Sequence, residues 1–337
     1  QSIDRTQIQK DVAICSVFLN QIRTDGQMWK CVIDANKALI CATRRGGAPV
    51  HINLEINNGY SLKKDMFPVE KLPKAKKIDY YDSLNGVPAI PNGKVAIFVG
   101  SHIPFTDGET NAIDDFCAKY GSIVFCDHTS NYYGKYRVLT GLIGQQENAV
   151  QNVSPDTLIH IGQVSGDYAS MGLAGRAKSV WRVAADGEMH DTFKKLDNLF
   201  AVKEKDFFEY YSSLKQAESG NGYLVECKEA YSKLYAKIPD ELPFSNIWVA
   251  KKLYQELPQK SFLQLGILNS LRSWNLFDSK SIVSEACNTG GFGIDGGVSS
   301  FVGAALAHKA DYYYCVTGDL AFFYDMNILG NRHIGNN

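Results

Sequence analysis

The sequence predicts an α/β protein with two doubly wound parallel-sheet domains. The chain has 337 residues, which is about the length of two average domains. Continuous apolar runs such as KVAIFVG (residues 94–100) are typical of strands that are buried on both faces of a sheet. These runs alternate with helical patterns along the chain, as they do in doubly wound sheets.

The composition excludes several classes of protein. Apolar residues make up 45% of the chain, and the net charge of −1 gives no field that would attract nucleic acid or an anionic membrane. No apolar stretch approaches the roughly 18 residues that span a bilayer. The first residues show neither a signal-peptide core nor an initiator methionine. We expect a cytoplasmic protein with no nucleic-acid or membrane partner, and a chain cut from a longer one.

The eight cysteines predict buried, reduced thiols. None forms a C-x-x-C pair, and most lie inside apolar runs. A zinc site would need clustered ligands, whereas the cysteines and the seven histidines are dispersed along the chain.

The first 93 residues are expected to precede the main sheets. Residues 8–43 carry helical patterns, and residues 46–57 give a glycine stop followed by an alternating strand. Residues 58–93 are polar and contain four prolines, which indicates a crossing linker. We therefore separate residues 1–57 from the domains that follow.

A central domain is predicted at residues 94–202, followed by linker helices at 203–244. Asp127 and His128, after one of its strands, are either a ligand pair or surface-loop residues, and the sequence favours the surface loop. The predicted strands are 94–100, 122–127, 155–163, 179–186 and 198–202, with helices at 107–121 and 167–177.

A second strand–helix series occupies residues 245–337. It opens with a helix at 243–258 for which Ser245 is the expected N-cap. Strands are predicted at 261–267, 281–287 and 312–318, and helices at 269–277, at 298–309 and after residue 318.

Three loops of this series follow the carboxyl ends of strands and should meet at one edge of the sheet. Asn269 and Ser270 offer donors at a helix start, and five glycines among residues 290–297 let a ligand approach the backbone. Asp319 offers a hard oxygen for Mg²⁺. The loops together suit a diphosphate with a divalent cation at helix N-termini. Taken singly, each feature favours a plainer interpretation: Ser270 as only an N-cap, and Gly318-Asp319 as a common turn.

In combination and order these residues resemble the thiamine-diphosphate-dependent 2-oxo acid decarboxylase/carboligase family. The likeness is closest to its menaquinone-pathway synthases (MenD), which also decarboxylate 2-oxoglutarate. The matching stretches run in family order from residue 46 to 327: GAPVHINLEI, PDTLIHIG, NSL, GFGIDGGVSSFVGAALA and TGDLAFFYDMN. The resemblance implies that residues 1–57 are the tail of a pyrimidine-binding domain. Residues 94–202 would be a Rossmann-like central domain, and residues 245–337 the first half of a diphosphate-binding domain.

The resemblance assigns roles around the diphosphate. Asp319 would be a ligand of Mg²⁺, and Gly318 and Leu320 would frame its turn. Asn269 and Ser270 would contact the diphosphate of the cofactor.

It also assigns roles around the rings of thiamine diphosphate. Ile294 would be the apolar wedge that bends the cofactor and so brings its two rings together. Gly293 would place a backbone carbonyl near the aminopyrimidine. Without the flanking motif, the sequence would favour a plain core residue at Ile294.

Several features depart from the family pattern. The catalytic glutamate of the family belongs to the N-terminal domain and is expected outside this chain. Asn336 and Asn337 lie too close to Asp319 to be the pair that closes the family motif. We therefore expect the isolated chain to be inactive.

The positions expected to hold basic substrate-binding residues carry none. Arg272 is nearby and is a possible substitute, but the use of isochorismate is in doubt, and a paralogue with another acceptor explains the loss equally well. The residues at those positions are Tyr168, Ala169, Trp274 and Thr289.

Three functional hypotheses remain open. The first is a decarboxylase and carboligase, which by resemblance forms a homodimer or homotetramer around its cofactor. The second is a non-catalytic α/β module that binds a diphosphate or nucleotide. The third is a structural subunit in which residues 288–297 form only a tight loop.

Overall fold

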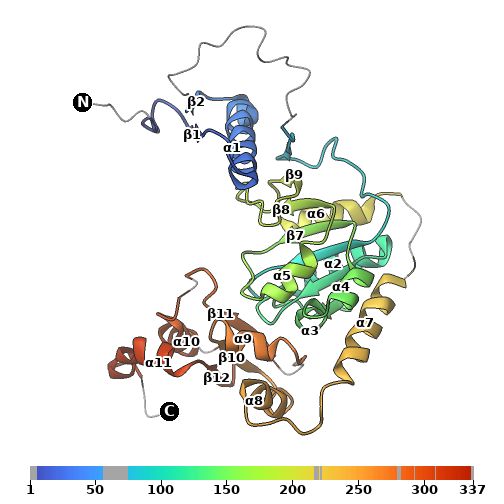
Figure 1. Cartoon of the computed structure of the whole chain (residues 1–337), viewed down its shortest axis with the longest axis vertical. Coiled ribbons are helices and arrows are strands. Elements are labelled where there is room, and N and C mark those ends of the chain that lie inside the picture. Colours follow the sequence, from blue (N-terminus) through green and yellow to red (C-terminus); the bar gives the residue numbers. More distant parts are fainter. Residues whose placement is uncertain are drawn as a thin grey trace.

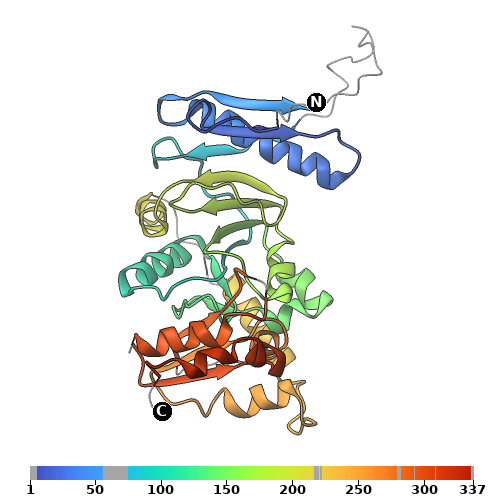
Figure 2. The same cartoon turned by 90° about the vertical axis from the view of Figure 1, so that its left-hand side faces the viewer.

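The computed structural model describes residues 6–55, 75–215, 220, 222–278, 282–291, 293–307 and 309–334. Three parallel sheets follow one another along the chain and lie one above the other (Figures 1 and 2). They have two, seven and three strands, in that order along the sequence. The prediction of an α/β protein with parallel sheets is therefore confirmed.

The N-terminal segment is a small β-α-β unit. Strand β1 (Cys15–Leu19) pairs in parallel with β2 (Val50–Leu54), and helix α1 (Asp25–Thr43) connects them. The 3-10 turn η1 (Arg44–Gly46) follows α1. The prediction of helix throughout residues 8–43 is wrong over β1, where Cys15 and Val17 alternate toward the small core beneath α1.

The central domain contains a seven-stranded parallel sheet in the order β3-β9-β8-β7-β4-β5-β6. The chain runs outward from β4 to β6, then crosses to β7 and runs outward again to β9. The carboxyl ends of β4 and β7 are therefore the switch point of the sheet. The strands are β3 (Asp79–Tyr81), β4 (Val95–Val99), β5 (Ile123–Cys126), β6 (Arg137–Leu139), β7 (Thr157–Ile161), β8 (Ser179–Val183) and β9 (Leu196–Phe200).

Helices cover both faces of this sheet. Helices α2 (Asp107–Tyr120) and α6 (Glu204–Ser213) pack on one face around Phe116. The other face is covered by α3 (Gly141–Gly144), α4 (Glu147–Val153), α5 (Tyr168–Ala174) and α7 (Gly222–Tyr235). Parts of both predicted linkers therefore belong to this domain. Strand β3, from the linker predicted at residues 58–93, forms one edge of the sheet, and α6 and α7, from the one predicted at 203–244, cover its faces.

Local sequence signals explain where α2 begins and ends. Thr106 accepts a hydrogen bond from the backbone N–H of Glu109, whose carboxylate in turn accepts from the N–H of Thr106. Gly121 ends the helix at φ +61°, a conformation that favours glycine. The acids in the first turn also suit the positive end of the helix dipole.

The C-terminal domain contains a three-stranded parallel sheet in the order β11-β10-β12. Its core gathers Leu263, Leu265, Trp274 and Phe277. Ser245 caps α8 as predicted, accepting from the N–H of Trp248. The elements are α8 (Asn246–Leu253), β10 (Ser261–Leu265), α9 (Asn269–Trp274), β11 (Ile282–Cys287), α10 (Gly297–Leu306), β12 (Tyr312–Val316), α11 (Asp319–Tyr324) and the 3-10 turn η3 (Met326–Gly330).

All eight cysteines are free thiols, and five of them are buried. Burial raises the pKa of Cys126 to about 12, so this thiol stays protonated at neutral pH. Within the described ranges no group of three His, Cys, Asp or Glu side chains is placed to hold a metal ion. The described helices also include none that combines the length and apolar character needed to cross a membrane.

Candidate functional site

A pocket of about 310 Å³ lies beyond the carboxyl ends of β10 and β12. Each of the three predicted loops contributes to its walls, so they do meet at one edge of the sheet. The lining consists of residues 264–270 together with Asn288, Gly293, Ile294, Gly297, Cys315, Thr317, Gly318, Leu320 and Ala321. Six of the seven predicted site residues line it, namely Asn269, Ser270, Gly293, Ile294, Gly318 and Leu320. The seventh, Asp319, lies next to the lining residues but is not among them.

The loop after β10 is held in a strained conformation. Leu268 has φ +70° and ψ −113°, a region that is almost exclusive to glycine. It occupies the N-cap position of α9, so Ser270 lies in the first turn and is not the cap. The sequence gives no signal for this strain, and its position in the pocket wall makes it a candidate functional feature.

The glycine-rich loop is shaped by contacts within itself. The side-chain amide of Asn288 donates to the carbonyl oxygen of Asp295 at 2.9 Å. A Cβ atom on Gly293 would lie 2.5 Å from the Asp295 carboxylate, which would have to move to admit a larger residue. Gly296, at φ +76°, turns the chain into α10.

Asp325, which was not predicted from the sequence, forms hydrogen bonds with the first turn of α10. Its two carboxylate oxygens accept from the backbone N–H and the hydroxyl of Ser299, each at 2.5 Å. One of the free N–H groups at this helix N-terminus is therefore already used by the protein. Because Ser299 is in α10 and Asp325 follows α11, the contact ties two walls of the pocket together.

Asp319 is exposed and stands at the first position of α11. One carboxylate oxygen accepts from the N–H of Leu320 at 2.8 Å. Asp319 alone cannot complete the oxygen shell of Mg²⁺, which takes protein carboxylates together with phosphate oxygens and water.

The donors around the pocket fit a diphosphate with a hard cation. An amide, a hydroxyl and a carboxylate stand within five residues of strand ends, at Asn269, Ser270 and Asp319. A Cβ atom on Gly297 or Gly318 would meet no other atom within 4 Å, so space for a ligand is open beside their backbone.

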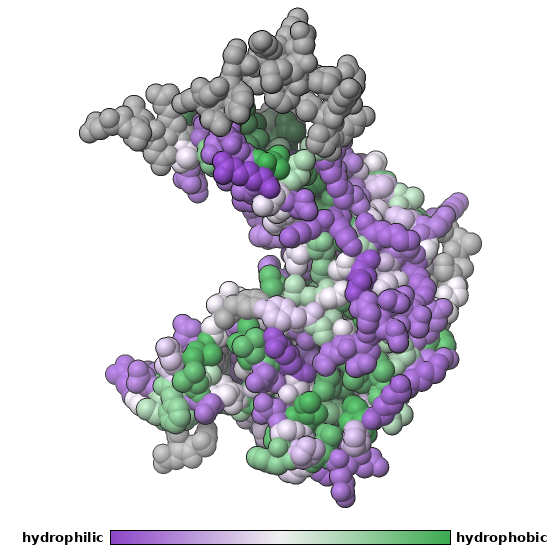
Figure 3. Space-filling model, viewed as in Figure 1, coloured by the Kyte–Doolittle hydropathy of each residue, from purple (hydrophilic) through white to green (hydrophobic). Residues whose placement is uncertain are grey.

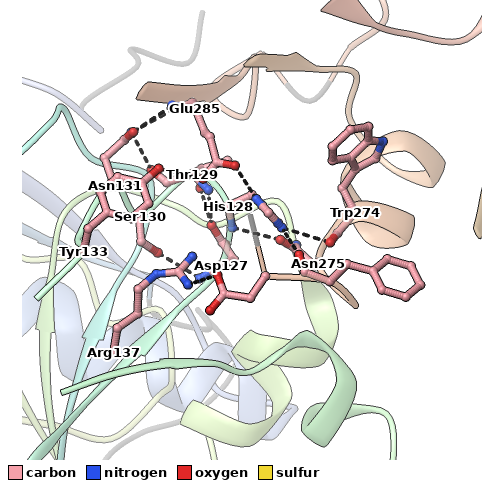
Figure 4. Close-up of polar contacts among 12 residues, drawn as sticks. Asp127, His128, Thr129, Ser130, Asn131, Tyr133, Arg137, Trp274, Asn275 and Glu285 are labelled. Carbon is pink, nitrogen blue, oxygen red and sulfur yellow. Dashed lines mark hydrogen bonds and ion pairs between the residues drawn. The ribbon is translucent and has the colours of Figure 1, made fainter. Parts of the chain in front are cut away.

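A buried polar network joins the central domain to the C-terminal domain (Figure 4). Asp127 and His128 are 1% and 0% exposed, so the prediction that they are surface-loop residues is wrong. His128 Nδ1 lies 2.5 Å from the Glu285 carboxylate, and Nε2 donates to the carbonyl oxygens of Trp274 and Phe277 at 2.9 and 2.8 Å. Burial lowers the pKa of His128, but the charge and hydrogen bond of Glu285 together outweigh it and raise the pKa above its ordinary value.

The same network fixes strand β11, from which the glycine-rich loop departs. Asn131 exchanges two hydrogen bonds of 2.8 Å with the backbone of Glu285, and the Tyr133 hydroxyl donates to the Glu285 carboxylate at 2.9 Å. Arg137 forms an ion pair with Asp278. The central domain therefore positions one wall of the pocket.

The residues at the expected substrate-binding positions are not equivalent. Trp274 is 1% exposed within the core and cannot contact a substrate in the pocket, and Thr289 is also buried. Tyr168 is exposed, and the guanidinium of Arg272 lies over its ring at 5.0 Å from the centroid. This cation–π contact therefore holds the basic side chain of Arg272 beside the start of α5.

Comparison with known proteins finds relatives along the whole chain, although no family model matches. The relatives are 2-succinyl-5-enolpyruvyl-6-hydroxy-3-cyclohexene-1-carboxylate synthases. The protein of Bacteroides fragilis is 28% identical over 356 aligned positions, covering 100% of this chain and 62% of the relative. That of Bacteroides thetaiotaomicron is 28% identical, covering 95% and 58%, and that of Flavobacterium johnsoniae is 25% identical, covering 98% and 61%. The chain spans about three fifths of the length of these curated relatives.

Proposed function

This chain is a partial MenD-like protein, and from that premise we propose that its C-terminal pocket binds the diphosphate of thiamine diphosphate together with Mg²⁺. The observation that carries the proposal is the meeting of three separate loops in one pocket, lined by six of the residues that the family motif singles out.

Each side chain of the pocket has a role in this proposal. Asn269 and Ser270 would donate to the diphosphate, and Asp319 would hold Mg²⁺. Ile294, half-buried in the lining, would be the wedge under the cofactor, with the Gly293 carbonyl near the aminopyrimidine. The bound cofactor would supply the electron sink for decarboxylation of a 2-oxo acid.

The proposed reaction is decarboxylation of a 2-oxo acid, with 2-oxoglutarate favoured, followed by carboligation to an acceptor. Arg272 would supply positive charge for a substrate carboxylate, because the ring of Tyr168 holds its guanidinium at the edge of the domain. Assays of carboligation with 2-oxoglutarate as the donor, once with isochorismate and once with other acceptors, would distinguish the synthase from a paralogue that uses another acceptor.

The C-terminal domain is also proposed to form a homodimer or homotetramer. Apolar side chains are exposed on α10, α11 and η3, including Leu306, Leu320, Phe323, Tyr324 and Leu329. Figure 3 shows apolar surface on this part of the molecule, at the lower left. Exposed apolar area of this kind marks interaction sites, and sedimentation velocity would measure the oligomeric state.

Titration calorimetry of the 337-residue chain with thiamine diphosphate and Mg²⁺ tests the proposal. We expect binding that Asp319→Asn weakens by at least about tenfold, which is about 1.4 kcal/mol. Asp311→Asn is the matched control, because Asp311 is an exposed acid at the opposite end of β12, paired with Lys260. Equal binding by the Asp319 variant and the wild type would reject the assigned metal ligand.

A non-catalytic diphosphate-binding module is the second candidate. It is favoured by one observation, that Asp319 lies outside the lining of the pocket and bonds to its own helix. Binding that persists unchanged when EDTA removes Mg²⁺ would support this candidate over the enzyme.

A further inference from the structure

Strand β11 is held on one side by its own sheet and on the other side by the central domain. It stands at one edge of the three-stranded sheet, where it pairs with β10. On its outer side the Asn131 side chain takes the place of a neighbouring strand, because it donates to the carbonyl oxygen of Glu285 and accepts from the N–H of the same residue, each at 2.8 Å. The position of β11 therefore depends on a loop of the central domain.

The glycine-rich loop of the cofactor pocket begins directly after this strand. Asn288 follows β11, lines the pocket and donates to the carbonyl oxygen of Asp295 at 2.9 Å. Gly293 and Ile294, which lie between these two residues in the sequence, also line the pocket. A displacement of β11 would therefore reach the pocket wall through Asn288.

The protons of the His128 ring follow from its hydrogen-bond partners (Figure 4). Nε2 lies 2.9 and 2.8 Å from the carbonyl oxygens of Trp274 and Phe277, which only accept, so Nε2 carries a proton. Nδ1 lies 2.5 Å from the Glu285 carboxylate, which also only accepts when it is ionised. A second proton must therefore lie between Nδ1 and this carboxylate, because without it a lone pair would face a negative charge in a buried contact.

The other titratable groups around the ring already have partners. The Tyr133 hydroxyl donates to the second carboxylate oxygen of Glu285 at 2.9 Å. Arg137, whose charge opposes protonation of the ring, forms an ion pair with Asp278. Asp127 accepts hydrogen bonds from two hydroxyl groups of its own domain. The shared proton therefore decides whether the contact between the ring and Glu285 is attractive or repulsive.

We propose that the proton shared by His128 and Glu285 controls the affinity of the cofactor pocket. While the pair holds the proton, β11 and the glycine-rich loop keep the position that binds the diphosphate. When the proton leaves, the contact becomes repulsive and the loop loses that position. His128 and Glu285 are positioning residues, because neither lines the pocket. The proposal rests on the function proposed above for the identity of the ligand, whereas the movement of β11 is a property of the chain without ligand.

The effect of pH on the pocket has a definite direction. Burial opposes a charged His128, but the charge and hydrogen bond of Glu285 outweigh it and raise the pKa of the ring. The protonated contact is therefore fully present below about pH 6.5 and is lost as the pH rises through the folded value. We expect the affinity of the pocket to fall as the pH rises above this range.

Hydrogen exchange of the chain without cofactor, at about pH 6 and about pH 9, tests the movement of β11. We expect the protection of residues 282–291, corrected for the intrinsic effect of pH on exchange, to fall by at least about fivefold relative to β4 and β7. In Glu285→Gln the introduced amide donates to the neutral ring and accepts from Tyr133, so protection should not depend on pH. His128→Gln cannot titrate either, and it replaces Glu285→Gln if that variant does not fold. The control is His190→Gln, which changes an exposed histidine of the central domain and should behave as the wild type does.

Titration calorimetry with thiamine diphosphate and Mg²⁺ at the same two pH values tests the link to the pocket. The affinity of the wild type, divided by that of Glu285→Gln, should fall by at least about fivefold at the higher pH. This ratio cancels the ionisation of the cofactor itself, which is common to both proteins.

Two results would overturn the proposal. One is protection of residues 282–291 that stays constant with pH in the wild type or falls equally in both glutamine variants. The other is cofactor binding whose affinity ratio is the same at both pH values. If protection falls as expected but no cofactor binds at either pH, the function proposed for the pocket is rejected, while the proton-dependent position of β11 is supported.

Discussion

The central and C-terminal sheets are both parallel, but they differ in how completely they are covered. Strands β4, β5 and β7 are buried along their whole length between two layers of helices. In the C-terminal sheet β10 is largely buried, and β12 forms an edge that is half-exposed. The central sheet is therefore stabilised by its own helices, whereas the C-terminal sheet depends on contacts with the central domain. The candidate cofactor site lies at the carboxyl ends of β10 and β12 in this less covered sheet.

The buried contact between the two domains should give the largest effect. Glu285→Ala would leave the His128 charge buried and unpaired, and we expect a loss of about 3–5 kcal/mol. Glu147→Gln, which removes an exposed ion pair with Arg176, should cost less than about 1 kcal/mol. Urea unfolding measures both, and equal effects would show that the C-terminal domain does not depend on this contact.

Removal of the carboxylate at α10 should have a smaller effect. Asp325→Ala removes two hydrogen bonds to Ser299, and loss of such a helix cap costs about 0.5–2 kcal/mol. The loss should appear as faster hydrogen exchange at the start of α10, with β4 and β7 unchanged. Faster exchange in the central strands as well would mean that the two sheets unfold as one unit.

The pH dependence of unfolding reports on His128. Its pKa is raised in the folded protein, so its stabilising contribution is fully present below the ordinary histidine value of about 6.5 and is lost as the pH rises through the folded value. The stability of the wild type relative to His128→Gln should therefore fall as the pH rises above about 6.5. A difference that stays constant with pH would contradict a charged His128 at the domain contact.

Relief of strain at Leu268 should have the smallest effect. Leu268→Gly suits φ +70° and removes strain, but it also frees the unfolded chain, so the net change should lie within about 1 kcal/mol. If the strain positions Asn269 for the cofactor, the variant should bind thiamine diphosphate more weakly despite its stability. Unchanged binding would show that the strained turn is not needed by the site.

The sequence predicted the parts of the fold that depend on local patterns. Long apolar runs predicted β4, β7 and β10. Because parallel strands end at the same edge of a sheet, the sequence also predicted that the three loops of the pocket meet. The short strands β3 and β6 carry only three residues each, too few for a pattern to stand out. The burial of His128 depends on Glu285, which is 157 residues away, and no local pattern reports such a contact.

Hydrogen exchange with and without thiamine diphosphate and Mg²⁺ tests the central claim most directly. We expect slower exchange at residues 266–270, 293–297 and 317–321, with residues 101–103 and 184–186 of the central domain unchanged. Protection around residues 101–103 and 184–186 instead, with the C-terminal loops unchanged, would contradict the assignment of the cofactor to the C-terminal pocket.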